Sequence, residues 1–128
     1  MTLTYLWVAL GGAIGSVTRF WLNAVVSARL GEAFPWGTVL VNVCGSFIIG
    51  LLGALTLPEN RMTVEARAFA IHFLMIGICG GFTTFSAFSL QMLELLQTGD
   101  VAPALLYAVG SVGLCLAFVW FGWWLGRV

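Results

Sequence analysis

The stretch that decides the fold is GICGGFTTFSAFS, residues 77–89, which lies inside the longest apolar segment of the chain. Glycine, threonine, serine and phenylalanine are weaker helix formers than leucine or alanine. We therefore expect a helix break in the middle of a segment that is otherwise apolar enough to cross a bilayer. Backbone groups freed by such a break need partners inside the protein, because lipid offers none. The stretch predicts a membrane protein with a polar site at the break.

The composition of the whole chain supports a membrane location. Of the 128 residues, 61% are hydrophobic and only 8% are charged, whereas roughly a quarter of the residues of a soluble domain are charged. Five arginines balance five acidic residues, so the net charge is zero. This balance removes the electrostatic basis for nucleic acid as a partner. The lipid bilayer is the expected environment.

Four membrane-spanning helices are predicted, because a span takes about 20 residues. They lie at about residues 4–27, 35–57, 65–96 and 101–125, in a single all-α domain covering residues 1–128. Pro35 suits the first turn of the second helix. Thr63 and Asp100 are expected to cap the third and fourth helices. The third helix is expected to break in the middle of the membrane.

The arginines give almost no preference for one orientation. With four spans, Arg61, Arg67 and Arg127 lie on one side of the membrane, and Arg19 and Arg29 lie on or near the other. Cytoplasmic flanks normally collect positive charge, so this near balance favours insertion both ways round and an antiparallel, dual-topology homodimer. A single fixed orientation is the alternative.

Small residues recur at four-residue spacing within the predicted spans. The pairs are Gly11 with Gly15, Ser46 with Gly50, and Gly77 with Gly81. Such spacing lets helices approach closely in lipid, where apolar burial gives no drive for association. The pairs therefore predict tight helix packing and specify no activity.

The polar side chains inside the spans indicate the sign of the transported ion. They are hydrogen-bond donors, and no carboxylate lies in the middle of a span. Cation paths need acidic side chains or rings of carbonyl groups, so this pattern favours an anion. The positive ring edges of Phe85 and Phe88 add to it. The alternatives are that the two phenylalanines only pack and that single serines bond back to their own helix.

Three segments resemble the Fluc (CrcB) family of fluoride ion channels. Residues 80–89, GGFTTFSAFS, are similar to the family's hallmark GGxTTFSxFS segment. Residues 12–20, GAIGSVTRF, resemble its glycine-rich first helix, and residues 35–42, PWGTVLVN, resemble its entry to the second. The resemblance covers the whole chain, and the three motifs occur in the right order.

This resemblance implies an antiparallel homodimer with two pores, which passes fluoride down its gradient and rejects chloride. By matching positions, Phe85 and Phe88 line the pore, Tyr107 and Ser111 form a polar track, and Asn42 and Arg19 serve the vestibule. From the residues themselves we add the hydroxyl groups of Thr84 and Ser86 to the pore and place Trp36 at an entrance. The complete expected site comprises Asn42, Thr84, Phe85, Ser86, Phe88, Tyr107 and Ser111 in the pore, and Arg19 and Trp36 in the vestibule.

The resemblance also implies a structural sodium ion at the centre of the dimer. Main-chain carbonyls of Gly80 and Thr83 from both subunits are its expected ligands, and hard cations prefer oxygen. The chain departs from the family pattern at three positions, which are Ala87, Gln91 and Cys115.

The expected function is passive export of fluoride across a bacterial inner membrane. One alternative is a small multidrug exporter, whose family has a glutamate in the first helix where this chain has no acid. A second is a non-conducting partner subunit of a heteromeric fluoride channel. An enzyme is not expected, because His72 has no carboxylate or nucleophile at helical spacing.

Overall fold

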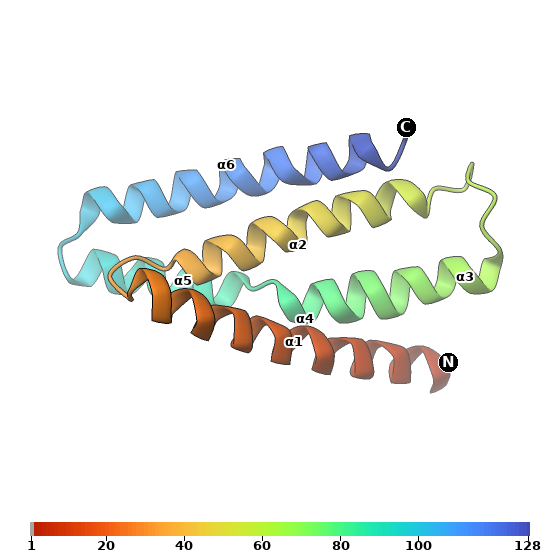
Figure 1. Cartoon of the computed structure of the whole chain (residues 1–128), viewed down its shortest axis with the longest axis horizontal. Helices are drawn as coiled ribbons and strands as arrows, with labels where there is room; N and C mark the ends of the chain where they lie inside the picture. Colours follow the sequence, from red (N-terminus) through yellow and green to blue (C-terminus); the bar gives the residue numbers. More distant parts are fainter. Residues whose placement is uncertain (1) are drawn as a thin grey trace.

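The computed structural model describes residues 2–128, and every regular element in that range is helical. The order is α1 (Thr2–Leu30), α2 (Trp36–Leu55), α3 (Val64–Phe69), η1 (Ala70–Cys79), α4 (Gly80–Phe82), α5 (Phe85–Gln97) and α6 (Val101–Leu125). Figure 1 shows α2 beside α6 and α1 beside the run from α3 to α4, with both termini at the same end of the bundle. The prediction of an all-α protein is confirmed.

Three helical stretches are long and apolar enough to cross a membrane. They are Trp36–Leu55, Val64–Gln97 and Val101–Leu125. The first helix, α1, is 29 residues long but more polar, since it contains Arg19 and Arg29. Its outer side still exposes large apolar side chains, including Leu10, Ile14 and Val17. The chain is therefore a multi-pass membrane protein, and the fourth crossing stays a prediction.

The ends of the helices follow local sequence signals with two differences. Thr63 caps α3 as predicted, because its Oγ1 accepts a hydrogen bond from Ala66 N at 3.2 Å. Pro35 lies just before α2 rather than in its first turn. Asp100 precedes α6 but makes no capping bond, which corrects the prediction. Its carboxylate instead accepts a hydrogen bond from Thr98 Oγ1 at 2.9 Å, so it is held by the preceding turn.

Glycines bring the backbones of α1 and the third span into direct contact. A Cβ atom added at Gly77 would lie 2.9 Å from Gly11 Cα, and one added at Gly15 would lie 2.8 Å from Phe82 N. Gly81 packs in the same way against the backbone of Gly12. The predicted role of these paired glycines in close packing is confirmed.

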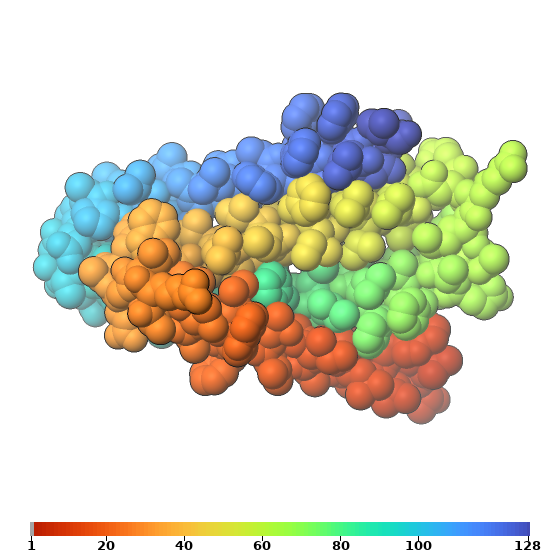
Figure 2. All heavy atoms as spheres, viewed as in Figure 1, coloured from red at the N-terminus to blue at the C-terminus, as the bar shows by residue number. Residues whose placement is uncertain are grey.

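A second set of glycines joins α2 to α6. A Cβ atom at Gly50 would meet the backbone of Val119, and one at Gly122 would meet the backbone of Phe47 and Leu51. Beyond this contact, large side chains gather on the last turns of α6, as Figure 2 shows. Trp120 is 67% exposed and Trp124 is 50% exposed. Tryptophans at a helix end are typical of the boundary between lipid and water.

The third span contains a feature that the sequence did not predict. Residues 70–79 form a π-helix, η1, which packs along α1. Its carbonyl oxygens at Phe73 and Ile78 are the atoms nearest to the positions that Cβ atoms of Gly11 and Gly15 would occupy. The wider helix thus directs main-chain oxygens at the glycine face of α1, a geometry typical of weak Cα–H···O contacts.

Close packing predicts different outcomes for two neighbouring glycines of α1. Gly15→Ala places a methyl group against the backbone of residues 78–82, whereas Gly12→Ala meets nothing within 4 Å. We expect Gly15→Ala to lower the free energy of unfolding by about 1–3 kcal/mol, because backbone cannot yield to the extra atom. Thermal unfolding of the protein purified in detergent measures this. Gly12→Ala is the control, and an equal loss in both variants would contradict the packing.

Candidate functional site

The chain leaves helical geometry at two consecutive residues, Thr83 and Thr84. Their backbone angles are φ −82°, ψ 159° and φ −152°, ψ 122°, so both are extended. Thr83 ends α4 with two bonds to the same acceptor, since its N–H and its hydroxyl both donate to Cys79 O, at 2.9 and 2.8 Å. The two threonines form a break between α4 and α5, within the stretch from Val64 to Gln97.

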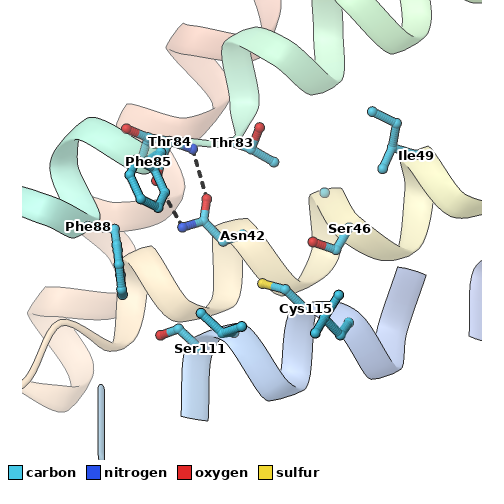
Figure 3. Close-up of a pocket in the computed structure, with 12 residues that line it drawn as sticks. Asn42, Ser46, Ile49, Thr83, Thr84, Phe85, Phe88, Ser111 and Cys115 are labelled. Carbon is cyan, nitrogen blue, oxygen red and sulfur yellow. Dashed lines mark hydrogen bonds between the residues drawn. The ribbon is translucent and has the colours of Figure 1, made fainter. Parts of the chain in front are cut away.

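Asn42 of α2 pairs with the backbone of Thr84. Its Nδ2 donates to Thr84 O at 3.0 Å, and its Oδ1 accepts from Thr84 N at 2.8 Å. Figure 3 shows both bonds as dashed lines running from α2 to the break. The side-chain amide thus bonds to Thr84 as a neighbouring strand would. Two residues 42 positions apart in the sequence are joined by this pair.

The break also frees carbonyl groups of α4. In a continuous helix Thr84 N–H would donate to Gly80 O, but here it donates to Asn42. Two side chains of α1 approach the neighbouring carbonyls. Ser16 Oγ donates to Gly81 O at 3.4 Å, and Arg19 Nη1 donates to Thr83 O at 3.5 Å. The site at the break therefore draws on α1 and α2 as well as on the third span.

Thr84 also begins the next helix. Its side chain is the N-cap of α5, because Oγ1 accepts a hydrogen bond from Ala87 N at 3.1 Å. The same oxygen lies 3.3 Å from Ser86 Oγ. The conformation of Thr84 therefore sets where α5 starts, and Phe85 and Phe88 lie on its first turn. Their ring centroids are 5.6 Å apart.

A cavity of about 340 Å³ lies beside the break. It is lined by side chains from α2, from the break, from the start of α5 and from α6 (Figure 3). The lining residues are Asn42, Gly45, Ser46, Ile49, Thr83, Thr84, Phe85, Phe88, Ser111, Val112, Cys115 and Leu116. Five of the predicted pore residues therefore share one cavity, namely Asn42, Thr84, Phe85, Phe88 and Ser111.

The cavity is neutral and contains an unused donor. Its lining includes no charged side chain among the residues that the structure describes. Ser111 is only 5% exposed, and its Oγ has no hydrogen-bond partner within residues 2–128. A buried hydroxyl without a partner is costly, so a ligand that accepts a hydrogen bond is favoured there. The alternative that Ser111 bonds back to its own helix is not what the structure shows.

Tyr107 stands apart from this cavity. It is fully buried, its ring lies 4.9 Å from that of Phe88, and its hydroxyl donates to Gln91 Oε1 at 2.8 Å. Gln91 in turn lines a second cavity of about 460 Å³ near the loop between α1 and α2. That cavity also contains Glu32, Glu94 and Asp100. Tyr107 thus contacts one lining residue of the neutral cavity and one of the cavity that contains the acidic residues.

The remaining predicted residues lie around the cavity rather than in its lining. Ser86 contacts Thr84 and is exposed. Arg19 of α1 donates a hydrogen bond to Thr83 O at the break. Trp36 begins α2, is 47% exposed, and its ring lies 4.6 Å from that of Phe34.

Two features of the site were missed from the sequence. A Cβ atom at Gly45 would collide with the Thr83 methyl group, so this glycine makes room for the break. The bond between Tyr107 and Gln91 was not predicted either. Gly45 follows Asn42 by three residues and therefore shares its helix face, which is the one signal that the sequence offered.

Known proteins of one family match this chain over nearly its whole length. The family model described as "CrcB-like protein, Camphor Resistance (CrcB)" matches residues 6–123. A relative from Opitutus terrae is 58% identical over 118 residues, which cover 92% of this chain and 88% of the relative. Relatives from Thermus thermophilus and Methylocella silvestris are 52% and 47% identical, and the matches cover 95% and 98% of this chain and 94% and 92% of the relatives. Each of the three is named "Fluoride-specific ion channel FluC". The chain therefore belongs to the CrcB family.

Proposed function

We propose that this chain forms a fluoride-selective ion channel that lets cytoplasmic fluoride leave the cell passively, across the inner membrane of a bacterium. Its relatives carry the name of fluoride-specific channels. The structural observation that carries the proposal is the unpaired Ser111 hydroxyl, in a neutral cavity shared with Phe85 and Phe88. The function relieves fluoride toxicity without consuming energy.

The lining of the cavity suits a small anion that must leave its water shell. An unpaired ion at membrane depth costs many kcal/mol, so protein groups must replace the lost water. Ser111 supplies an O–H donor, and one N–H of Asn42 stays free after its bond to Thr84. Fluoride is smaller than chloride and accepts stronger hydrogen bonds, so it gains more from a few close donors.

The two phenylalanines act through their ring edges. The hydrogen edge of an aromatic ring carries the positive part of its quadrupole. Phe85 is 78% exposed in the single subunit, and both rings line the cavity. An anion moving along the cavity therefore meets weakly positive edges and no acidic side chain.

The two alternative functions have less support. The hypothesis of a small multidrug exporter is not supported, because the chain belongs to the CrcB family. A non-conducting partner subunit predicts no flux from the chain alone. Measurement of flux in the purified protein therefore tests the main proposal against both.

Fluoride release from proteoliposomes tests the channel and its phenylalanines together. We expect the wild-type protein to release fluoride, read with a fluoride electrode, and to release chloride far more slowly. Phe85→Ile and Phe88→Ile should each reduce fluoride release by tenfold or more, because isoleucine fills space but has no positive edge. Phe121→Ile is the matched control, since this residue is 44% exposed on α6 and lies outside the cavity.

Two outcomes would contradict this prediction. Absence of fluoride release from the wild-type protein would reject the channel. Wild-type release by both cavity variants, at equal incorporation into vesicles, would remove the phenylalanines from the path.

We also propose that α1 is a fourth crossing and that two copies pair as an antiparallel homodimer. The exposed Leu10, Ile14 and Val17 give α1 a lipid-facing side, and α1 packs along the third span over most of that span's first half. The hydrogen bond from Arg19 to the break places this charge 11 residues before the end of α1. With Arg19 counted toward the side of Arg29, three arginines stand against two, so neither orientation is strongly preferred.

Labelling of a cysteine at the start of α1 tests this dual topology. An impermeant maleimide applied to intact cells should label Thr2→Cys in one population and leave another protected. The two populations should be about equal, because every antiparallel dimer contains one copy in each orientation. The parent protein, which retains Cys44, Cys79 and Cys115, is the control. Labelling of all copies or of none would contradict two orientations.

A structural sodium ion at the dimer centre is a further part of the proposal. The carbonyls of Gly80 and Thr83 fit it chemically, because the break deprives Gly80 O of its helical donor and leaves Thr83 O with one long bond from Arg19. Bound there, sodium would neutralise the repulsion between carbonyl oxygens of the two subunits.

Crystallography of the dimer checks the ion. We expect density for a monovalent ion on the twofold axis, surrounded by carbonyl oxygens of Gly80 and Thr83, and we expect Thr83→Pro to abolish it by altering the break. Replacement of sodium by rubidium in the crystals is the control for assignment. A water molecule or no density at the axis would contradict the site.

A further inference from the structure

We propose that Asn42 is a positioning residue. Through two hydrogen bonds to the backbone of Thr84 it fixes the conformation in which α5 presents Phe85 and Phe88 to the cavity. The consequence for fluoride flux rests on the proposed function, but the positioning itself does not.

The bonds themselves restrict what else Asn42 can do. Nδ2 donates to Thr84 O at 3.0 Å and Oδ1 accepts from Thr84 N at 2.8 Å, so the amide is bonded to the peptide groups on both sides of Thr84 Cα. A side-chain amide has two N–H donors, and one is committed. Turning Asn42 to give both donors to an ion would break the pair and orphan two backbone groups of a residue that is 7% exposed. Asn42 therefore acts on the site mainly through Thr84.

Only asparagine matches this geometry among the common side chains. Its donor and acceptor lie side by side on a short, planar group, so both reach the N–H and the C=O of one residue. Ionised aspartate has no donor for Thr84 O, serine has a single polar atom, and glutamine is one methylene longer. The pairing therefore explains the residue type at position 42 without reference to a bound ion.

The conformation of Thr84 determines where Phe85 and Phe88 lie. Its extended backbone is followed directly by Phe85, and its Oγ1 caps α5 at Ala87 N. Loss of the pair with Asn42 leaves Thr84 free to return to helical angles, which moves the first turn of α5. Both phenylalanines lie on that turn.

The helix α2 holds the break at a second point. Gly45 lies one turn from Asn42, and its missing side chain leaves the space that the Thr83 methyl group fills. If Thr83 adopted helical backbone angles, its methyl group would leave this space. One face of α2 thus fixes both residues of the break, the first by shape and the second by hydrogen bonds.

Backbone amide exchange tests the positioning role without any transport measurement. In fluoride-free buffer the exchange rate of Thr84 N–H, measured by nuclear magnetic resonance, should rise roughly tenfold in Asn42→Leu, which keeps the volume and removes both bonds. Ser46→Ala is the matched control. It lies one turn further along α2, lines the same cavity and makes no side-chain hydrogen bond among the described residues.

A fluorine label on the aromatic residues provides the second measurement. With 4-fluorophenylalanine incorporated at position 85 or 88, Asn42→Leu should shift or broaden the ¹⁹F signal in fluoride-free buffer, and Ser46→Ala should not. Asn42→Asp keeps the shape of the side chain and the acceptor for Thr84 N–H. It replaces the leucine variant in both measurements if that variant does not fold. It should give a smaller change of the same kind.

The outcomes separate this proposal from the channel function. Unchanged Thr84 exchange and unchanged ¹⁹F signals in folded Asn42 variants, together with reduced fluoride release, would leave direct contact with the ion as the only role of Asn42 and overturn the positioning role. Absence of fluoride release from the wild-type protein would reject the channel and leave the exchange result standing.

Discussion

The structure depends on one constraint, which is that backbone groups released inside a bilayer must be satisfied by the protein. The chain leaves helical geometry at Thr83 and Thr84, within an apolar stretch of 34 residues. Three side chains of α1 and α2 bond to the backbone groups that the break releases. Asn42 satisfies both backbone groups of Thr84, and Ser16 and Arg19 donate to the carbonyls just before it. The break and its partners therefore form one unit, which fixes how α1 and α2 sit against the third span.

Close packing by glycine makes this unit possible. Ser16 and Arg19 reach the carbonyls of the break only because Gly11 and Gly15 let α1 lie directly on the backbone of η1 and α4. Gly45 does the same for α2 by leaving space for Thr83. In lipid, helix association depends on van der Waals contact and hydrogen bonds rather than on apolar burial. The close contact between helix backbones at these glycines provides the packing and also brings the polar side chains to their partners.

The acidic side chains and the hydrogen-bond donors of the site line two different cavities. Glu32, Glu94 and Asp100 share the second cavity, near the loop between α1 and α2. The cavity beside the break is neutral. Tyr107 is buried and contacts one lining residue of each cavity, Phe88 and Gln91. The Ser111 hydroxyl, which has no partner within residues 2–128, offers a donor to a small acceptor, and the neutral wall around it contains no carboxylate for a mobile cation. This arrangement is the physical basis of anion preference in the proposed channel.

The sequence alone determined the helical class, the apolar segments and the glycine pairs, because these depend on local composition and spacing. Residues 80–89 even identified the family. The tertiary structure decided which polar groups meet. Asn42 and Thr84 are 42 residues apart, and nothing local distinguishes an asparagine that offers its amide to an ion from one that pairs with a backbone. Tyr107 shows the same limit, since the resemblance placed it on a polar track with Ser111, whereas its hydroxyl donates to Gln91 in the folded chain. Helical periodicity fixes the face of a side chain, and only the neighbouring helix fixes its partner.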